Sequence, residues 1–345
     1  MVCDLLFLLS FSKALVIHCL KSYCKQLSQT LFLVKIAFVF PGQGSQSVGM
    51  ASGFADNAAA AAVMKTADAT LGESLSGLIA EGPAEKLNLT VNTQPAVLSV
   101  SYALYSAWLA AGGVKPAVAA GHSLGEYTAL LAAGTFTLEE AVKLVRFRAE
   151  AMQSAVPVGV GGMAAIIGLT DEAVEKACAE AAEGEVVEPV NFNSPGQVVI
   201  AGNTAAVARA CEKCKAAGAK RALPLAVSGP FHSKLLAGAA QKLGVRLSEV
   251  EVKTPAFDVI ANVDAAVHTA PDDIRTVLAR QAASPVQWVK TVHAMKAMGV
   301  THVVECGPGK VLTGLIRRID PTIETANISS VDAIAALLEK DGFRA

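Results

Sequence analysis

The stretch Ala119-Ala120-Gly121-His122-Ser123-Leu124-Gly125-Glu126-Tyr127 predicts a buried strand, a serine between two glycines, and the start of an apolar helix. Gly-x-Ser-x-Gly at a strand-to-helix junction is typical of a nucleophile elbow, whose glycines permit a tight turn that lifts the serine hydroxyl out of the sheet. The positive end of the following helix then faces whatever the hydroxyl attacks. The alternative is a glycine-bracketed turn with an incidental serine.

The composition favours a globular protein that acts on a small molecule or another protein. The chain has 345 residues, of which 52% are hydrophobic and 17% charged, so it is long enough for two domains or one elaborated domain. The formal net charge is −1, and no run of lysine or arginine occurs. We therefore expect no nucleic-acid partner.

The cysteines indicate a reducing compartment, and we expect a cytoplasmic protein. There are seven of them, an odd number and too few for a disulfide scaffold. Cys211 and Cys214 have the spacing of a metal or redox pair, but they lie in an alanine-rich helical pattern without a second ligand pair. We interpret them as ordinary helix cysteines and expect no metal site.

Residues 1–34 differ in character from the rest of the chain. The apolar run from Leu5 to Leu20 suggests a signal peptide or membrane anchor, but Asp4 precedes it and Lys13 and His18 interrupt it. We expect this segment to be an extension outside the fold, an artefact of the chosen start site, and we expect no membrane partner. A secretory leader is the alternative.

After this segment the pattern is that of an α/β fold with a central parallel sheet. The apolar run from Ile36 to Phe40 is typical of a parallel strand covered on both faces. Its loop, residues 41–46, contains glycines that permit close backbone approach to a ligand. We predict a large α/β domain formed by residues 35–158 and 229–345.

Between residues 159 and 228 the predicted elements follow the order β-α-β-β-α-β. This order is the split βαβ arrangement of a ferredoxin-like unit, so we predict a small ferredoxin-like domain inserted into the large one. Residues 191–196, Asn-Phe-Asn-Ser-Pro-Gly, are expected to form its central turn, because asparagine and Pro-Gly are usual turn residues.

Arg148 lies on the apolar stripe of a predicted helix. Thr137 and Glu140 form a capping box, so this helix starts at Leu138, and Arg148 then has the spacing of the buried face. A buried arginine must be paired or face a cavity, because burying it alone is very costly. A purely structural pairing is the alternative to a binding role.

A serine nucleophile needs a base, an orienting group and donors for the oxyanion. Adjacent residues on a sharp elbow point in different directions, so His232 is a better base for Ser123 than His122 is. The backbone N–H of Leu124 is the natural oxyanion donor, and the loop containing Gln43 can supply another. The sequence between the elbow and the histidine offers no obvious triad acid, and a backbone carbonyl could orient the imidazole instead.

Six segments together resemble the bacterial malonyl-CoA:acyl carrier protein transacylases of type II fatty acid synthesis. The resemblance extends in one uninterrupted order from about Lys35 to the C-terminus. It implies an α/β-hydrolase-like large domain with a central parallel sheet and an inserted ferredoxin-like small domain. The segments are residues 40–46 (FPGQGSQ), 93–95 (TQP), 121–127 (GHSLGEY), 191–196 (NFNSPG), 230–232 (PFH) and 307–310 (GPGK).

The resemblance implies a ping-pong reaction in which Ser123 takes malonyl from coenzyme A and passes it to the phosphopantetheine thiol of acyl carrier protein. His232 would be the acid and base, oriented by the carbonyl of Gln281, and Arg148 would bind the malonyl carboxylate. Phe231 would limit the size of the acyl group. The oxyanion hole would be formed by Gln43 and Leu124, and the remaining pocket residues would be Gln94, His122, Asn191 and Asn193.

The resemblance also implies a monomer that needs no cofactor, since the coenzyme A thioester is a substrate. Two other functions remain open at this point. An esterase or thioesterase could use the same nucleophile, although Arg148 and the missing triad acid disfavour it. A non-catalytic acyl-CoA-binding protein is disfavoured because the serine, the histidine and both oxyanion segments are present.

Overall fold

The computed structural model describes residues 34–157, 159–227 and 229–345. Contacts within the chain separate Met1–Lys35 from Ile36–Ala345, and every element named below belongs to the second unit. The expectation for the N-terminal segment falls, except for residue 34, outside the described residues. Among the helices that are described, none is long and apolar enough to cross a membrane.

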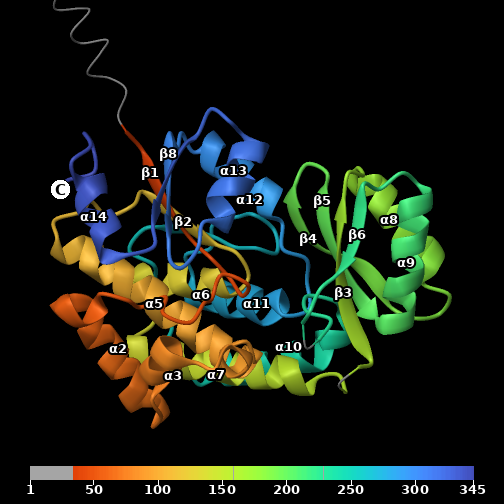
Figure 1. Ribbon diagram of the computed structural model, residues 1–345, viewed down its shortest axis with the longest axis horizontal. Coiled ribbons are helices and arrows are strands. Elements are labelled where there is room, and N and C mark those ends of the chain that lie inside the picture. The colour runs from red at the N-terminus through yellow and green to blue at the C-terminus, as the bar shows by residue number, and fades with distance from the viewer. Residues whose placement is uncertain (1–33, 158, 228) are drawn as a thin grey trace, which may run out of the picture. The chain divides into compact units, whose positions relative to one another are not determined.

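A five-stranded parallel sheet forms the centre of the fold, in the order β7-β2-β1-β8-β9 (Figure 1). All five residues of the central strand β1 are buried, which confirms the parallel strand predicted from its continuous apolar run. The strands are β1 Ile36–Phe40, β2 Val118–Gly121, β7 Asp258–Ile260, β8 His302–Cys306 and β9 Glu324–Ile328.

Helices cover both faces of this sheet. Alternate side chains of β1 point to opposite faces, so they pack into two different cores. Phe38 and Phe40 pack into the larger core, built with α2, α3, α5, α6, α7, α10, α11 and α14. Ala37 and Val39 pack against α12 and α13 on the other face. These helices are α2 Ala58–Leu71, α3 Leu75–Glu81, α5 Thr90–Ala110, α6 Leu124–Ala132, α7 Leu138–Ser154, α10 Ala237–Ser248, α11 Pro271–Gln281, α12 Trp288–Ala297, α13 Val311–Ile319 and α14 Val331–Leu338, with the short α4 at Ala84–Leu87.

A separate antiparallel sheet with the order β4-β5-β3-β6 forms the right-hand part of Figure 1. Its elements follow the predicted β-α-β-β-α-β order, and α8 and α9 share an apolar core with one of its faces. Met163 and Val199 belong instead to the larger core of the parallel sheet. The elements are β3 Gly161–Ile167, α8 Asp171–Ala181, β4 Val187–Ser194, β5 Gln197–Asn203, α9 Thr204–Ala216 and β6 Arg221–Pro224, all within the predicted 159–228.

The turn predicted for residues 191–196 is wrong for its first four residues. Strand β4 continues to Ser194, with irregular pairing to β5 on both sides of Asn191, and only Pro195 and Gly196 form the turn. The extended backbone is held from the other edge as well, because Phe192 donates its N–H to the carbonyl of Val286 at 3.1 Å. Tertiary pairing on both edges overrides the turn preference of asparagine, and the irregular pairing bends the strand locally.

The glycines of the elbow are needed for close packing of helix α6 on the sheet. A Cβ atom on Gly125 would lie 1.9 Å from the carbonyl oxygen of Phe40, and one on Gly121 would lie 1.8 Å from the carbonyl carbon of Gly125. The strained residue is Ser123 itself, whose φ of 52° and ψ of −106° lie outside the ordinary regions for a side-chain-bearing residue.

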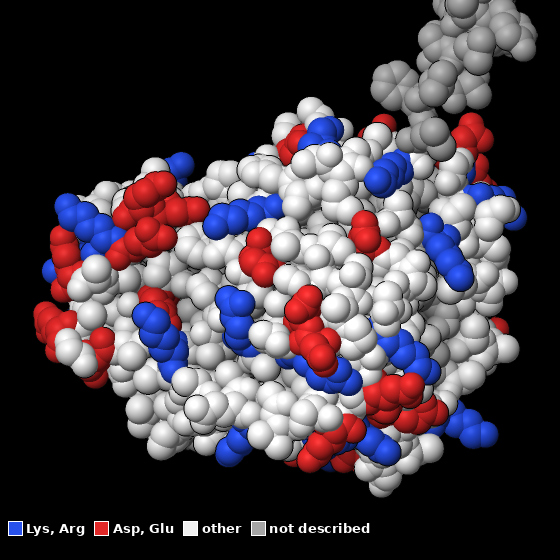
Figure 2. Space-filling model, turned by 180° about the vertical axis from the view of Figure 1, so that it is seen from behind, with Lys and Arg blue, Asp and Glu red and all other residues white. Residues whose placement is uncertain are grey.

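Charged side chains are mixed on the face seen in Figure 2, where lysine and arginine alternate with aspartate and glutamate. Neither sign covers that face as a continuous patch. This distribution agrees with the formal net charge of −1.

We expect Gly125→Ala to destabilise the fold by about 2–3 kcal/mol, because the new methyl group overlaps a backbone atom that cannot move independently. Gly314→Ala is the matched control, since Gly314 lies within helix α13 and a Cβ there meets nothing within 4 Å. The control should stabilise by about 0.5–1 kcal/mol. Urea unfolding of both variants measures these changes, and equal stabilities would contradict the packing role of Gly125.

Candidate active site

A cavity of about 250 Å³ lies where the main sheet meets the antiparallel sheet. The loops after β1 and β2 contribute to its wall, so the cavity lies at the carboxyl ends of parallel strands. Ten of the eleven predicted site residues line it: Gln43, Gln94, His122, Ser123, Leu124, Arg148, Asn191, Asn193, Phe231 and His232. The eleventh, Gln281, contacts three of these residues.

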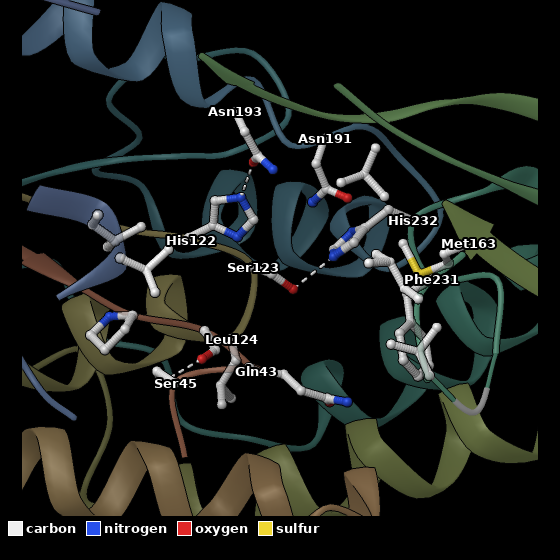
Figure 3. Close-up of a pocket in the computed structure, with 18 of the residues that line it drawn as sticks. Gln43, Ser45, His122, Ser123, Leu124, Met163, Asn191, Asn193, Phe231 and His232 are labelled. Carbon is white, nitrogen blue, oxygen red and sulfur yellow. Dashed lines mark hydrogen bonds between the residues drawn. The ribbon is translucent and has the colours of Figure 1, made fainter. Parts of the chain in front are cut away.

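Ser123 and His232 point toward each other across this cavity (Figure 3). The serine Oγ lies 2.7 Å from Nε2 of the imidazole, and Nδ1 lies 2.8 Å from the carbonyl oxygen of Gln281. A carbonyl oxygen only accepts hydrogen bonds, so Nδ1 carries the proton and Nε2 is free to accept from the serine hydroxyl. The pair therefore has the geometry of a nucleophile with its general base.

The imidazole of His232 is buried, with only 3% of the residue exposed. Burial, together with the nearby positive charge of Arg148, lowers the pKa of His232 to about 3. The ring is consequently neutral at physiological pH, which is the state required of a base.

His122 points away from the nucleophile, in the direction expected for the neighbour of an elbow serine. Its Nε2 lies 2.8 Å from Oδ1 of Asn193 (Figure 3). The centre of its ring lies 5.7 Å from that of Trp288. The structure thus separates the roles of the two histidines, and His122 instead fixes the side chain of Asn193 in the pocket wall.

Two backbone N–H groups border the nucleophile without a hydrogen-bond partner in the described part of the chain. One belongs to Leu124, the first residue of α6, and the other to Gln43. The loop of Gln43 approaches closely because Gly42 has no side chain, and a Cβ there would lie 2.5 Å from the carbonyl oxygen of His122. The Gln43 side chain is engaged elsewhere, accepting from Thr90 Oγ1 at 2.7 Å.

Arg148 is a buried cation, 1% exposed, that points at the nucleophile. One Nη donates to Gln94 Oε1 at 2.6 Å, and the other donates to Gln281 Oε1 at 2.9 Å and to Ser123 Oγ at 3.1 Å. The guanidinium also lies 5.2 Å from the centre of the Tyr127 ring. No described aspartate or glutamate lies within ion-pair distance of it.

Asn262 is a site residue that the sequence analysis missed. It follows strand β7, and its side chain accepts from the N–H of Ser123 at 2.6 Å while donating to the carbonyl of Gly121 at 2.6 Å. It therefore holds the backbone of the elbow on both sides of the turn. The sequence signal that could have identified Asn262 is a single amide residue close to the end of an apolar strand.

Cys211 and Cys214 lie in helix α9, as the helical pattern of that segment predicted. Both are free and buried in α9. Over the described residues, no group of three or more potential metal ligands occurs.

We expect the imidazole of His232 to remain neutral from pH 8 down to pH 5. In spectra of protein with isotope-labelled histidine, its ring signals should not shift over this range, whereas the urea-unfolded chain should titrate near pH 6.5. Comparison with the spectrum of His232→Gln identifies the signals. A titration midpoint near 6.5 in the folded protein would contradict the predicted effect of burial.

Comparisons with known proteins agree on one family. The acyl transferase domain family matches residues 37–343. The malonyl CoA-acyl carrier protein transacylase of Escherichia coli (strain K12) is 54% identical over 311 residues, which cover 89% of this chain and 100% of that relative.

Solved structures extend the comparison to the fold. An acyl-carrier-protein S-malonyltransferase from Burkholderia pseudomallei is 55% identical, with a TM-score of 0.88, over 89% of this chain and 100% of that one. A malonyl-transacylase in complex with a type II polyketide acyl carrier protein is 47% identical, with a TM-score of 0.87, over 88% and 99%. The chain therefore belongs to the acyl transferase domain family and, within it, to the malonyl CoA-acyl carrier protein transacylases.

Proposed function

We propose that this protein transfers the malonyl group of malonyl-CoA to the phosphopantetheine thiol of acyl carrier protein, through a malonyl ester on Ser123. The observation that carries the proposal is the buried guanidinium of Arg148. It lies within hydrogen-bond distance of the nucleophile and has no described carboxylate as an ion-pair partner. The names of the relatives support the same reaction.

A substrate carboxylate would supply the direct ion-pair partner that Arg148 lacks among the described residues. A carboxylate can accept two parallel N–H bonds from a guanidinium, which adds both energy and orientation. A plain acyl group would leave the arginine buried without a charged partner, and the cost of that loss disfavours it. Arg148 thus selects acyl groups that end in a carboxylate.

The first half-reaction forms the malonyl ester. Ser123 Oγ attacks the thioester carbonyl while its proton passes to Nε2 of His232. The developing oxyanion accepts hydrogen bonds from the backbone N–H groups of Gln43 and Leu124. The C–S bond then breaks, and the coenzyme A sulfur takes the proton from His232 as it leaves.

The second half-reaction runs the same steps with another thiol. The phosphopantetheine thiol of the carrier gives its proton to His232 and attacks the ester carbonyl, and Ser123 recovers its proton as the ester bond breaks. Every proton and acyl group is thus accounted for by the two thiols and the protein's side chains. We propose no cofactor, and we assign the carrier to fatty acid elongation.

The size of the acyl group is limited by the side chain before the base. Phe231 is buried and lines the cavity near His232 (Figure 3), so its ring leaves less room for a branched acyl group. Such steric discrimination amounts to about 1–3 kcal/mol. Asn191 and Gln94 would add polar contacts to the substrate from the same cavity.

We also propose the fold class of each domain, the oligomeric state and the cellular compartment. The strand order β4-β5-β3-β6 with α8 and α9 supports a ferredoxin-like small domain. The elbow after a parallel strand supports an α/β-hydrolase-like large domain. The family resemblance supports a monomeric enzyme that works in the cytoplasm.

The reaction is tested by trapping its intermediate. Incubation with malonyl-CoA in the absence of carrier protein should add one malonyl group to the peptide that contains Ser123, seen by mass spectrometry. Addition of carrier protein should then remove it and give malonylated carrier. Ser123→Ala is the control and should not be labelled. Release of free malonate in place of carrier loading would favour a thioesterase.

We expect Arg148→Ala to lower kcat/KM for malonyl-CoA by at least about 100-fold, because the variant loses two charge-assisted hydrogen bonds to the substrate carboxylate. The same variant should gain transfer of acetyl groups, because the buried charge is gone. Arg146→Ala is the matched control, since Arg146 lies on the same helix but pairs with Glu73. Full malonyl transfer by Arg148→Ala would exclude the carboxylate-binding role.

A further inference from the structure

Glu126 is a buried carboxylate behind the site that has no part in the reaction described above. It is the third residue of helix α6 and is 2% exposed, and it does not line the cavity. Its Oε2 accepts two hydrogen bonds, from the N–H of Asn262 at 2.9 Å and from Nε2 of Gln281 at 2.7 Å. A single oxygen therefore joins two residues that come from distant parts of the chain.

Both of these residues hold the backbone of the nucleophile. Asn262 accepts from the N–H of Ser123 at 2.6 Å, and Gln281 Nε2 donates to the carbonyl oxygen of Ser123 at 2.9 Å. The two polar backbone groups of the strained serine are thus held by the side chains of two residues that Glu126 contacts, Asn262 through its backbone N–H and Gln281 through its amide.

The contact with Glu126, together with the Ser123 carbonyl that accepts from the same Nε2, sets which end of the Gln281 amide faces Arg148. Oε2 accepts two N–H groups, so it carries no proton and requires the NH₂ end of the amide. The amide oxygen must then face the other way, where it accepts from Arg148 at 2.9 Å. A reversed amide would place N–H donors against the N–H donors of the guanidinium.

We propose that Glu126 is a positioning residue for the carboxylate-binding arginine. By fixing the Gln281 amide, it keeps the guanidinium of Arg148 directed at Ser123, and so acts on acyl selectivity without touching the substrate. The inference rests on the proposed function and deepens it. Gln281 Nε2 has two acceptors, Glu126 Oε2 and the carbonyl oxygen of Ser123, and Glu126 is the one that a substitution can remove.

The electrostatics of the group agree with this role. Burial raises the pKa of Glu126 to about 7, while the hydrogen bonds from Gln281 and Asn262 and the positive charge of Arg148 act in the opposite direction. Protonation would occur on the other oxygen, Oε1, because Oε2 already accepts two hydrogen bonds. The acceptor that orients Gln281 is therefore present in both states.

The test compares three variants of Glu126 by the ratio of kcat/KM for malonyl-CoA to kcat/KM for acetyl-CoA, with acyl carrier protein as acceptor. Glu126→Gln keeps an acceptor oxygen. The N–H of Asn262 requires that oxygen, and not the NH₂ group, at the position of Oε2. The ratio should therefore stay within about threefold of wild type. Glu126→Met has a similar size but no acceptor, and its ratio should fall at least tenfold. Glu126→Asp is shorter by one C–C bond, about 1.5 Å, and should also lose at least tenfold.

Asp68→Leu is the matched control for lost stability. Asp68 accepts from the N–H and the hydroxyl of Ser76 and does not line the cavity. Its removal should lower Tm, as we also expect of Glu126→Met, while the malonyl-to-acetyl ratio should stay at the wild-type value. This control separates a selectivity effect from general destabilisation.

The inference would be overturned if Glu126→Met reduced both reactions equally, since an unchanged ratio means a structural role only. A tenfold loss of the ratio in Glu126→Gln would also overturn it, because that variant removes charge and keeps the acceptor. If Glu126→Met does not fold, equal ratios in Glu126→Asp and Glu126→Gln have the same meaning. Wild-type protein that transfers no malonyl would instead contradict the proposed function.

Discussion

The strained backbone of Ser123 is the constraint on which the site depends. Its φ of 52° places the hydroxyl above the end of the sheet, and conformations of this kind cost of the order of 1–3 kcal/mol. The cost is tolerated because both polar backbone groups of the serine are hydrogen-bonded, by Asn262 and Gln281. Helix α6 also packs closely on the carbonyl of Phe40, which only a glycine at position 125 permits, and this packing further stabilises the backbone of Ser123.

A second feature follows from the first, because the same glutamine that holds the serine also contacts the arginine and the base. The side chain of Gln281 accepts from Arg148, and its main-chain carbonyl accepts from His232. Nucleophile, base and cation are therefore linked through one residue of α11. A carbonyl in the usual place of a triad carboxylate leaves His232 without a negative partner, which is consistent with its low pKa.

Much of the site could be predicted because its signals are local or belong to regular elements. The elbow follows from a five-residue pattern, and the burial of Arg148 follows from helix periodicity and a capping box that is present in the structure. Asn262 and Glu126 escaped prediction because their roles arise only from contacts across more than 130 residues of sequence. The strand at Asn191 was missed because local turn preference was outweighed by pairing on both edges.

Local sequence alone determined the parallel strand at Ile36–Phe40, the elbow, and the helix face that carries Arg148, because each depends on residues close in the chain. Only the tertiary structure decided which side chain holds the N–H of Ser123 and how the amide of Gln281 is turned. Those choices depend on hydrogen-bond donors and acceptors brought together from β2, α6, α7 and α11, and no spacing in the chain encodes their mutual direction.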